Sequence, residues 1–425
     1  MYAIDLFCGA GGMAEGILQA GFQILFASDL NADVEKTYTN RKKQLGYIQG
    51  THYQFHRGDI RDLTGEMIWD AIQNLDMFQH GLSCPSEIDA IFGGPPCQGF
   101  SRAGKRDVND PRNLLFREYL RVISEVRPKY VVMENVEGIR DLVFPSFHGI
   151  SGHTYYDQTV PVLLEKELNQ IGYQLLTPKT LNAADYGVPQ NRKRVIFLAY
   201  RDDQPIPRYP EATMEKKRTL EDAITDGPYR HLCTAGRTPS ISGIPIKETS
   251  PKNLELSKHN SIIEERFSLY NEGETTAQLR KRIVEHGIDL SSCPSLISFL
   301  SIQTGFAESE CLKLAKDGNV DETFLNLLLT KKQIRKKLKR SDPSPTITTM
   351  GDDFISPYTN QAFSVRDLAR IQSFDDSFVF LGKRTTGGKR RRTDVPQYTQ
   401  VGNAVPPLLA RAIALEIKQC LEGKR

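Results

Sequence analysis

Short apolar runs alternate with longer amphipathic segments over roughly the first 200 residues of this 425-residue chain. Such alternation predicts strands joined by crossover helices, and hence an α/β fold with a mostly parallel sheet and helices on both faces. Ligands of such sheets lie beyond the carboxyl ends of the strands, so this pattern also predicts where a site must be. The predicted strands are Ala3–Phe7, Gln23–Ser28, Tyr53–Arg57, Ile88–Phe92, Tyr130–Met133, Tyr173–Thr180 and Val195–Ala199, and the predicted helices between them include Met13–Ala20, Ala32–Arg41, Glu66–Phe78, Leu114–Val126 and Val160–Ile171.

The pattern changes after about Asp202, where a proline cluster is followed by polar, irregular sequence up to about Arg340. Strands and helices return at Pro343 and close with an apolar helix, Pro407–Leu421. We therefore predict that residues 1–201 and 341–425 form one domain. Residues 202–340 would be a second, smaller and irregular domain.

The composition excludes several classes of protein. No run of about 18 apolar residues occurs and no basic-then-apolar leader is present, so we expect a soluble, cytoplasmic protein that does not contact membranes. The seven cysteines are scattered without Cys-x-x-Cys spacing, which argues against a disulfide framework or a metal site. The net charge is only +3, but basic residues gather in Lys331–Arg340 and Lys383–Arg392, which suits a polyanionic partner.

A single thiol lies on a loop shaped by glycine and proline. Cys97 follows the predicted strand Ile88–Phe92 within the segment Gly93–Ser101. The two prolines before it and Gly99 after it stop either regular element from continuing, so the backbone around the sulfur is largely preset. Taken alone, such a cysteine is more often a buried apolar side chain of a turn. The residues at neighbouring strand ends favour a nucleophile instead.

Glycines and acids gather where the first three strands end. Asp5–Gly12 opens a helix at Met13, so a ligand can approach a helix amino terminus closely. This turn suits a dinucleotide and S-adenosylmethionine alike, and a tight turn without any ligand is an alternative. Asp29 and Asp59 end the next two strands, where they could accept hydrogen bonds from ribose hydroxyls or an exocyclic amine. Because acids repel phosphates, we expect a nucleoside with few phosphates.

A carboxylate and two arginines are predicted to lie near Cys97. Glu134 ends an apolar strand, where it would be partly removed from water and able to carry a proton. In Gln190–Arg194 two arginines at alternate positions point to one face, and cationic neighbours favour the reactive thiolate. Together these groups suit nucleophilic addition to a polarised ring, although each alone could be solvated surface. A cysteine hydrolase would need a histidine partner, and none of the eight lies at a predicted strand end.

Six segments, in content and in order, resemble the motifs of the DNA (cytosine-5)-methyltransferase family. The similarity spans about residues 3–200 and 343–421. It implies an S-adenosylmethionine-dependent, Rossmann-like catalytic and cofactor-binding domain in 1–201 and 341–425, and a target-recognition domain in 202–340. The segments are Asp5–Gly12, Gly93–Ser101, Glu134–Val136, Gln190–Arg194, Arg366–Phe374 and Gln400–Pro407.

By that resemblance, Cys97 adds to carbon 6 of a cytosine, Glu134 donates a proton to ring nitrogen 3 and Arg194 contacts the ring carbonyl oxygen. Carbon 5 then takes the methyl group, and loss of its proton with expulsion of the thiolate regenerates the enzyme. Arg192 belongs to the same implied catalytic set, and no metal ion is implied. The implied contacts to S-adenosyl-L-methionine are Phe7, Gly9, Gly12, Asp29, Leu30, Asp59, Ile60, Pro96, Leu115, Asn403 and Val405.

The implied substrate is double-stranded DNA with the target cytosine flipped out of the duplex; methyltransferases are among the standard examples of base flipping. The loop Gly99–Arg112 would close over it, while Lys331–Arg340 and the turn Gly387–Arg392 would contact phosphates, unless they are solvated surface. We expect a monomer near the bacterial nucleoid that is paired with a separately acting restriction endonuclease. Asp29 and Leu30 stand where the family commonly has Glu and an aromatic residue.

Three other functions fit parts of the sequence. A tRNA cytosine methyltransferase shares the architecture, but the Cys-Phe-Thr signature of that branch is absent. A catalytically inactive DNA-binding regulator would have lost Cys97, Glu134 or the arginines, and all are present. A nicotinamide-dependent oxidoreductase could use the glycine turn but would leave Cys97 and Glu134 without a role. DNA methylation is therefore the favoured function.

Overall fold

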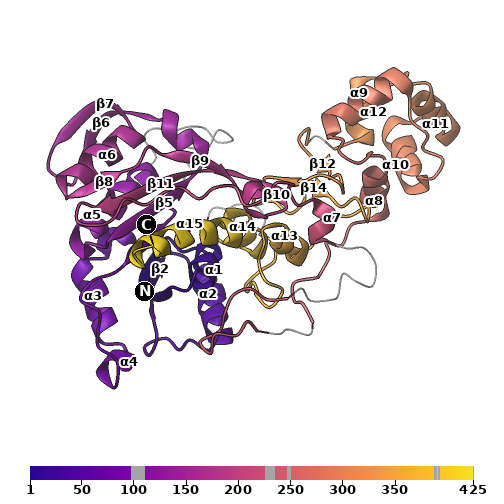
Figure 1. Ribbon diagram of the computed structural model, residues 1–425. Coiled ribbons are helices and arrows are strands. Elements are labelled where there is room, and N and C mark those ends of the chain that lie inside the picture. The colour runs from indigo at the N-terminus through magenta and orange to yellow at the C-terminus, as the bar shows by residue number, and fades with distance from the viewer. Residues whose placement is uncertain are drawn as a thin grey trace.

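The chain forms a body of sheet and helices with a separate group of helices at one side (Figure 1). The computed structural model describes residues 1–96, 111–224, 235–246, 250–330, 332–386, 390 and 393–424. Both ends of the chain belong to the body, where the indigo start and the yellow end lie close together.

A mostly parallel sheet forms the centre of the body, which confirms the predicted α/β class. Its strand order is β3-β2-β1-β4-β5-β11-β8, and β9 pairs with β11 as well. The strands from β3 to β5 run parallel, whereas β11 is antiparallel to β5, β8 and β9. The order reverses between β1 and β4, so a ligand crevice is expected beyond their carboxyl ends. The bounds are β1 Tyr2–Leu6, β2 Gln23–Asp29, β3 Gln54–Arg57, β4 Ala90–Gly93, β5 Tyr130–Asn135, β8 Tyr173–Leu175, β9 Lys179–Asn182 and β11 Lys193–Arg201.

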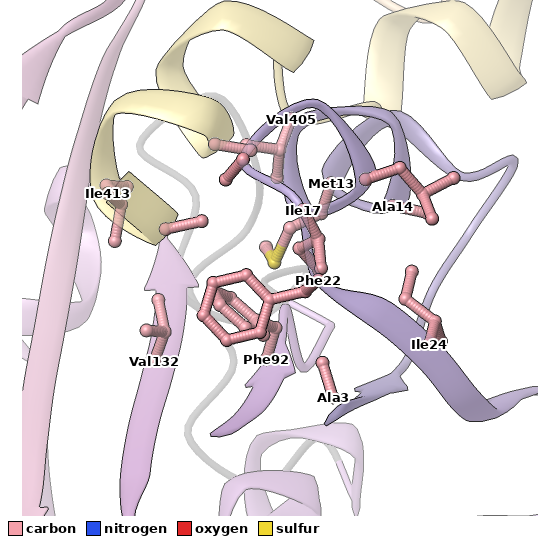
Figure 2. Close-up of a cluster of buried hydrophobic side chains, with 14 of the residues drawn as sticks. Ala3, Met13, Ala14, Ile17, Phe22, Ile24, Phe92, Val132, Val405 and Ile413 are labelled. Atoms are coloured by element: carbon pink, nitrogen blue, oxygen red, sulfur yellow. The ribbon is translucent and has the colours of Figure 1, made fainter. Parts of the chain in front are cut away.

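Helices cover both faces of this sheet, and an apolar core fills each interface. On one face α1 and α15 pack over the strands, and Ile17, Phe92 and Ile413 meet there (Figure 2). On the other face α3, α5 and α6 bury a second cluster of leucine, isoleucine, valine and aromatic side chains. Each such side chain stabilises the fold by about 1.5–3 kcal/mol when fully buried. The bounds are α1 Gly12–Gln19, α2 Ala32–Gln44, α3 Gly65–Gln73, α4 Asp76–Gln79, α5 Leu115–Val126, α6 Val160–Gln170 and α15 Pro407–Leu421.

The two ends of the chain complete one core. The first helix, α1, packs along the last helix, α15. A Cβ on Gly16 would lie 2.4 Å from the carbonyl oxygen of Pro407 and 2.5 Å from the amide nitrogen of Arg411. Only glycine permits this approach, because backbone atoms cannot rotate away as a side chain could. The body therefore needs residues from both ends of the sequence.

Two predicted elements are interrupted in the structure. The predicted strand Tyr173–Thr180 is two short strands, β8 and β9. Pro178 lies between them, and proline cannot donate to a sheet ladder. The predicted helix Glu66–Phe78 is α3 followed by α4, because the backbone leaves the helical conformation at Asn74 and is extended at Leu75.

A hairpin that the sequence did not predict follows β5. It consists of β6 (Val143–His148) and β7 (Thr154–Thr159), paired antiparallel. Its buried face packs against the body through Phe147, whose ring stacks 5.2 Å from that of Phe116. Pro145 inside β6 argues against a strand when only the sequence is read.

Residues 202–340 were predicted to be irregular, and within this region residues 261–328 are instead mainly helical. The described part contains helices α8 to α12, which form the group at the side of the body (Figure 1). Their core includes Leu279, Leu300, Cys311 and Phe324. These helices have only 7 to 11 residues, so few turns repeat and the apolar periodicity is weak in the sequence. The bounds are α8 Ser261–Ser268, α9 Thr276–His286, α10 Pro294–Thr304, α11 Glu308–Lys316 and α12 Glu322–Leu328.

Short elements connect the body to the helical group. Strand β10 pairs with β13, and β12 pairs with β14. The bounds of the remaining short elements are β10 Gln190–Asn191, β12 Lys336–Lys337, β13 Ser344–Pro345, β14 Phe354–Ile355, α7 Leu220–Ala223, α13 Val365–Ile371 and α14 Gln397–Asn403, with 3-10 turns η1 Ile60–Asp62, η2 Pro111–Leu114, η3 Glu137–Asp141 and η4 Ala183–Tyr186.

Among the described helices, none is long and apolar enough to cross a membrane.

Candidate active site

A cavity of about 420 Å³ lies at the carboxyl ends of β1, β2, β4 and β5. This is the edge of the sheet at which the sequence predicted a ligand. Cys97 lies outside the described residues, but its neighbour Pro96 lines the cavity. The other candidate residues that line it are Phe7, Gly9, Gly12, Asp29, Leu30, Asp59, Ile60, Leu115, Glu134, Arg192, Arg194, Asn403 and Val405.

The glycine turn after β1 is bent by positive backbone angles. Gly9 and Gly11 have φ of 52° and 97°, and Phe7 has φ of 54°, a region that a bulky residue rarely occupies. Strain of this kind gathers at ligand sites, where the surrounding structure enforces it. A Cβ on Gly12 would lie 2.4 Å from the carbonyl oxygen of Val405. Glycine therefore lets the segment before α15 close one wall of the cavity.

Asp29 holds the glycine turn and faces the cavity. Its carboxylate accepts hydrogen bonds from the amide of Gly9 at 3.1 Å and from the amide of Asn31 at 2.9 Å. Burial raises the pKa of this carboxyl, while these backbone donors lower it. The neighbouring Leu30 is 67% exposed although it lines a cavity. A carboxylate next to an uncovered apolar side chain can bind a sugar hydroxyl and an aromatic base together.

Asp59 lies at the outer rim of the same cavity. Its carboxylate accepts from the guanidinium of Arg61 at 2.9 Å and 2.5 Å, and from the Arg61 amide at 3.0 Å. The hydrogen bond to this arginine lowers the pKa of Asp59, so the carboxylate stays charged. A carboxylate at this position can accept a further hydrogen bond from an amino group of a ligand.

Glu134 and Arg194 meet on neighbouring strands at the inner end of the cavity. Glu134 is the residue before the last of β5 and pairs with Ile196 of β11, so Arg194 lies two residues along the same face. The Arg194 Nε lies 2.8 Å from the Glu134 Oε1, and each side chain is only 12% exposed. Water is largely excluded from the Glu134–Arg194 pair, and electrostatic interactions are stronger where water is absent. The pair can therefore hold a polar ring in one orientation.

Arg192 is built into the wall rather than pointing freely at a ligand. It is 2% exposed, and its guanidinium donates to the carbonyl oxygens of Ile347 at 3.2 Å and Gly402 at 3.0 Å. These carbonyls belong to two segments that lie after residue 340 in the sequence. Arg192 therefore joins β11 to both segments that close the cavity.

Two residues at the site were not singled out by the sequence. Asn135 donates from Nδ2 to the carbonyl oxygen of Pro95 at 3.0 Å and so holds the start of the Cys97 loop. Asp5 is 1% exposed and lines the cavity floor. Its position one strand away from Asp29 was visible in the sequence, but no pattern there shows that its carboxylate is buried.

Asp5 and Lys42 are both buried, and their charges act on each other. Within the described part of the chain, neither the Asp5 oxygens nor the Lys42 Nζ has a hydrogen-bond partner. The Lys42 Nζ lies 4.9 Å from the ring centroid of Tyr47 and 5.3 Å from that of Tyr53. Burial raises the pKa of Asp5 to about 8 and lowers the pKa of Lys42 to about 8.

Four basic residues of the segment Lys331–Arg340 form ion pairs within the protein chain. Arg335 is 7% exposed and pairs with Asp352, and Arg340 pairs with Glu272. Lys332 pairs with Asp352 and Asp353, and Lys339 lies 3.5 Å from Asp342. These ion pairs argue that most of the segment is structural.

Several other predictions concern residues that are not described. Residues 97–110 of the loop Gly99–Arg112 lie outside the described residues, although Arg112 lines the cavity. Lys331 and most of the turn Gly387–Arg392 are outside as well, except Arg390. Among the residues that are described, no group of three or more His, Cys, Asp and Glu side chains could hold a metal ion.

Comparisons with known proteins agree on one family. The family model described as C-5 cytosine-specific DNA methylase matches residues 1–419. The chain is 31% identical over 429 residues to the type II methyltransferase M.DdeI of Desulfomicrobium norvegicum, which covers 100% of this chain and 90% of that protein. It is also 31% identical to the type II methyltransferase M1.HphI of Haemophilus parahaemolyticus, over 97% of this chain and 85% of that protein.

A solved structure shares the fold. It belongs to an E. coli prophage protein assigned as a DNA modification methyltransferase. The TM-score is 0.61 with 21% identity, and the similarity covers 99% of both chains. At this identity the likeness supports the architecture alone.

Proposed function

The chain belongs to the C-5 cytosine-specific DNA methylase family, and from this premise we propose that the cavity described above is its catalytic and cofactor site. Members of this family methylate carbon 5 of a cytosine in DNA through a covalent cysteine adduct, with the base flipped out of the duplex. The observation that carries the proposal is that the acids, glycines and Glu134–Arg194 pair predicted from distant motifs line one cavity.

We propose that S-adenosyl-L-methionine is the methyl donor and that the outer half of the cavity binds it. Asp29 would accept from the ribose hydroxyls, Asp59 from the adenine amino group, and Leu30 would pack on the adenosine. The donor supplies an electrophilic methyl group on a positively charged sulfur. The residues fit such a molecule because they offer acids and apolar surface, and because the glycine turn leaves room for its methionine end. The remaining proposed contacts are Phe7, Gly9, Gly12, Ile60, Pro96, Leu115, Asn403 and Val405.

At the inner half, we propose that Cys97 adds through its sulfur to carbon 6 of the cytosine while Glu134 gives a proton to ring nitrogen 3. Arg194 would hold the Glu134 carboxylate and reach the ring carbonyl oxygen. Carbon 5 thereby gains the electron density to form a bond to the methyl group. Loss of the carbon 5 proton to water then breaks the bond between carbon 6 and the Cys97 sulfur, which leaves as thiolate. Ring nitrogen 3 returns its proton to Glu134, and the aromatic ring is restored. Arg192 would act as a positioning residue, because its donors hold the walls together.

The test is methyl transfer from labelled S-adenosylmethionine to unmethylated DNA and to tRNA in parallel, with base-resolution mapping of the product. We expect label on DNA cytosine, and none with Cys97→Ala. Glu134→Gln should reduce kcat by about 100-fold or more, since it removes the proton donor. As a matched control, Glu66→Gln on the exposed side of α3 should keep full activity. Label on tRNA alone, or transfer that survives Cys97→Ala, would contradict the proposal.

The finer organisation also belongs to the proposal. Residues 202–340 would be the target-recognition domain and 1–201 with 341–425 the catalytic domain. We infer a monomeric cytoplasmic enzyme near the nucleoid, and a separate restriction endonuclease that cuts the same site. The type II methyltransferase names of the relatives support the last inference. Light scattering tests the monomer, and cleavage of unmethylated but not methylated DNA by a cell extract tests the nuclease.

A further inference from the structure

Two exposed apolar side chains lie on turns beside the proposed catalytic site. Ile334 is 69% exposed in the turn Gln333–Ile334, and Met350 is 37% exposed in the segment between Thr348 and Asp353. A single exposed apolar side chain needs no explanation. These two residues differ from the other exposed apolar residues because ion pairs join their two turns. The second turn also directly follows Ile347, which hydrogen-bonds to Arg192 in the wall of the cavity. We call residues 332–335 and 348–353 the paired turns.

Ion pairs make the paired turns one rigid unit. The Lys332 Nζ lies 3.1 Å from the Asp352 Oδ1, and the Arg335 Nη2 lies 2.7 Å from the Asp352 Oδ2. Lys332 also pairs with Asp353, and the Arg335 Nε donates to the Asp352 carbonyl oxygen at 2.9 Å. The Arg335 guanidinium lies 5.2 Å from the ring centroid of Phe267 in the helical group. Ile334 and Met350 therefore lie on turns whose backbones are held together by ion pairs.

Residues 348–353, the second of the paired turns, directly follow Ile347, which is hydrogen-bonded to the wall of the cavity. Ile347 accepts from Arg192 at 3.2 Å, and its own amide donates to the Gln190 Oε1 at 2.9 Å. A Cβ on Gly402 would lie 2.3 Å from the Thr348 carbonyl oxygen, so this backbone is pressed against the cavity wall. Figure 1 shows β12 and β14 between β10 and the helical group. Met350 therefore lies two residues beyond a backbone segment that packs on a residue of the cavity wall.

The charges of the paired turns do not suit phosphate contact. Lys332 and Arg335 are the cations among their described residues, and both are neutralised by Asp352 and Asp353. Asp352 is 47% exposed at its side chain and would repel a phosphate. The paired turns also expose apolar surface, at Ile334 and Met350. In the major groove, the group that matches an apolar side chain is the 5-methyl of thymine.

On the basis of the proposed function, we propose that Ile334 and Met350 contact thymine methyl groups in the major groove next to the flipped cytosine. The two side chains then act as specificity-determining residues. The recognition sequence accordingly contains at least one A·T pair, and the enzyme distinguishes thymine from uracil at that position.

The experiment first maps the methylated sequence at base resolution, and then replaces each thymine of that sequence by deoxyuridine, one at a time, in oligonucleotide duplexes. This change removes one methyl group and keeps every hydrogen bond. We expect kcat/KM of the unmodified enzyme to fall about fourfold at a contacted thymine, the effect of one buried methyl group. Ile334→Ala and Met350→Ala should each lower kcat/KM on thymine DNA and lose the uracil effect at the position contacted.

Ile302→Ala is the matched control, because Ile302 is 76% exposed on α10 and should keep the full uracil effect. Melting temperatures within about 2 °C of the unmodified enzyme would show that both test variants fold. A recognition sequence without A·T pairs, or no uracil effect at any position in an active enzyme, would overturn the inference and leave the proposed function intact. A uracil effect that persists in both variants would also overturn it. Absence of methyl transfer to any DNA would overturn both proposals.

Discussion

The body and the helical group of α8 to α12 both have apolar cores, but they differ in the charged side chains that they bury. The body buries charges beneath its cavity, including Asp5, Glu15, Arg41 and Lys42. The described helical group, residues 261–328, buries leucine, isoleucine, phenylalanine and cysteine, with Thr276 as its buried polar residue. Buried charge destabilises a fold unless it is paired, so it is retained where a site needs it.

The two cores also differ in how far apart their residues lie in the sequence. The body joins α1 to α15 across almost the whole chain. The helical group forms within one stretch and adds Ile355 of β14 to its core. Damage to the body should therefore abolish the catalytic cavity, whereas damage to the helical group should leave that cavity intact. Four predictions test this contrast.

The largest effect is expected from Gly16→Val. Its Cβ would fall 2.4 Å from the Pro407 carbonyl oxygen and 2.5 Å from the Ala410 Cβ, so α1 and α15 must separate. We expect a loss of about 4 kcal/mol or more in the free energy of unfolding, and no binding of S-adenosylmethionine. Urea unfolding followed by the fluorescence of Trp69, the only tryptophan, measures it. Gly81→Ala is the control, since a Cβ there meets nothing within 4 Å. Equal stability of both variants would contradict the packing argument.

Leu300→Ala should damage the helical group alone. Leu300 is fully buried in α10, and its truncation leaves a cavity that costs about 3 kcal/mol. Circular dichroism should show part of the helix signal melting at lower urea, while the Trp69 transition and cofactor affinity stay unchanged. Val284→Ala, at a position 52% exposed on α9, is the matched control. A parallel shift of the Trp69 transition would mean that the two cores unfold as one.

Asp5→Asn should change how stability depends on pH. Because the pKa of Asp5 is raised to about 8 in the folded chain, the folded state keeps a proton that the unfolded chain has lost. Asp5 therefore makes the protein less stable as pH rises from about 4 to 8, by at most about 1.4 kcal/mol per pH unit. The lowered pKa of Lys42 acts only between about 8 and 10.5, where stability rises with pH.

The measurement is urea unfolding of both proteins between pH 6 and pH 8. We expect the free energy of unfolding of Asp5→Asn to fall less over this interval than that of the unmodified chain. Asp70→Asn, at an exposed position of α3, should follow the unmodified chain. Identical pH slopes for Asp5→Asn and the unmodified chain would show that Asp5 is ionised when buried.

The smallest effect is expected from Lys339→Gln and Arg340→Gln. Both side chains are about half exposed and already pair with Asp342 and Glu272. Exposed pairs contribute about 0–1 kcal/mol, so stability should hardly change. If neither cation contacts phosphate, the dependence of DNA affinity on salt will stay the same. A slope reduced by about 0.9 for each variant would instead restore the phosphate hypothesis for this segment.

Much of the site was predictable because its residues follow strand ends. Asp29 ends β2, Asp59 follows the end of β3 by two residues and Glu134 is the residue before the last of β5. Parallel strands bring their carboxyl ends to one edge of a sheet. The glycines of the first turn carried a similar signal through their backbone freedom. The burial of Arg192 was not predictable, since an arginine two residues from Arg194 looks the same in sequence whether it faces a ligand or a carbonyl.

The helical group and the hairpin β6–β7 show a second limit. The helices of the group are short, and Pro145 interrupts the strand pattern of the hairpin, so the sequence pattern for a helix or a strand was weak. Tertiary packing decided that these segments form helices and a hairpin. The same holds for the basic segment. Its charge was evident, but the acids that neutralise Arg335 and Arg340 come from Asp352 and Glu272 on other segments.

The sequence by itself determined the α/β order, the family and the set of residues proposed for the chemistry, because these depend on residue type and on local spacing. Tertiary structure alone decided which charges are buried, which arginine meets Glu134 and which turns stand beside the cavity. Those features depend on contacts between residues that lie far apart in the chain. Such contacts form only when hydrophobic burial brings the segments together, so the sequence of one segment cannot predict them.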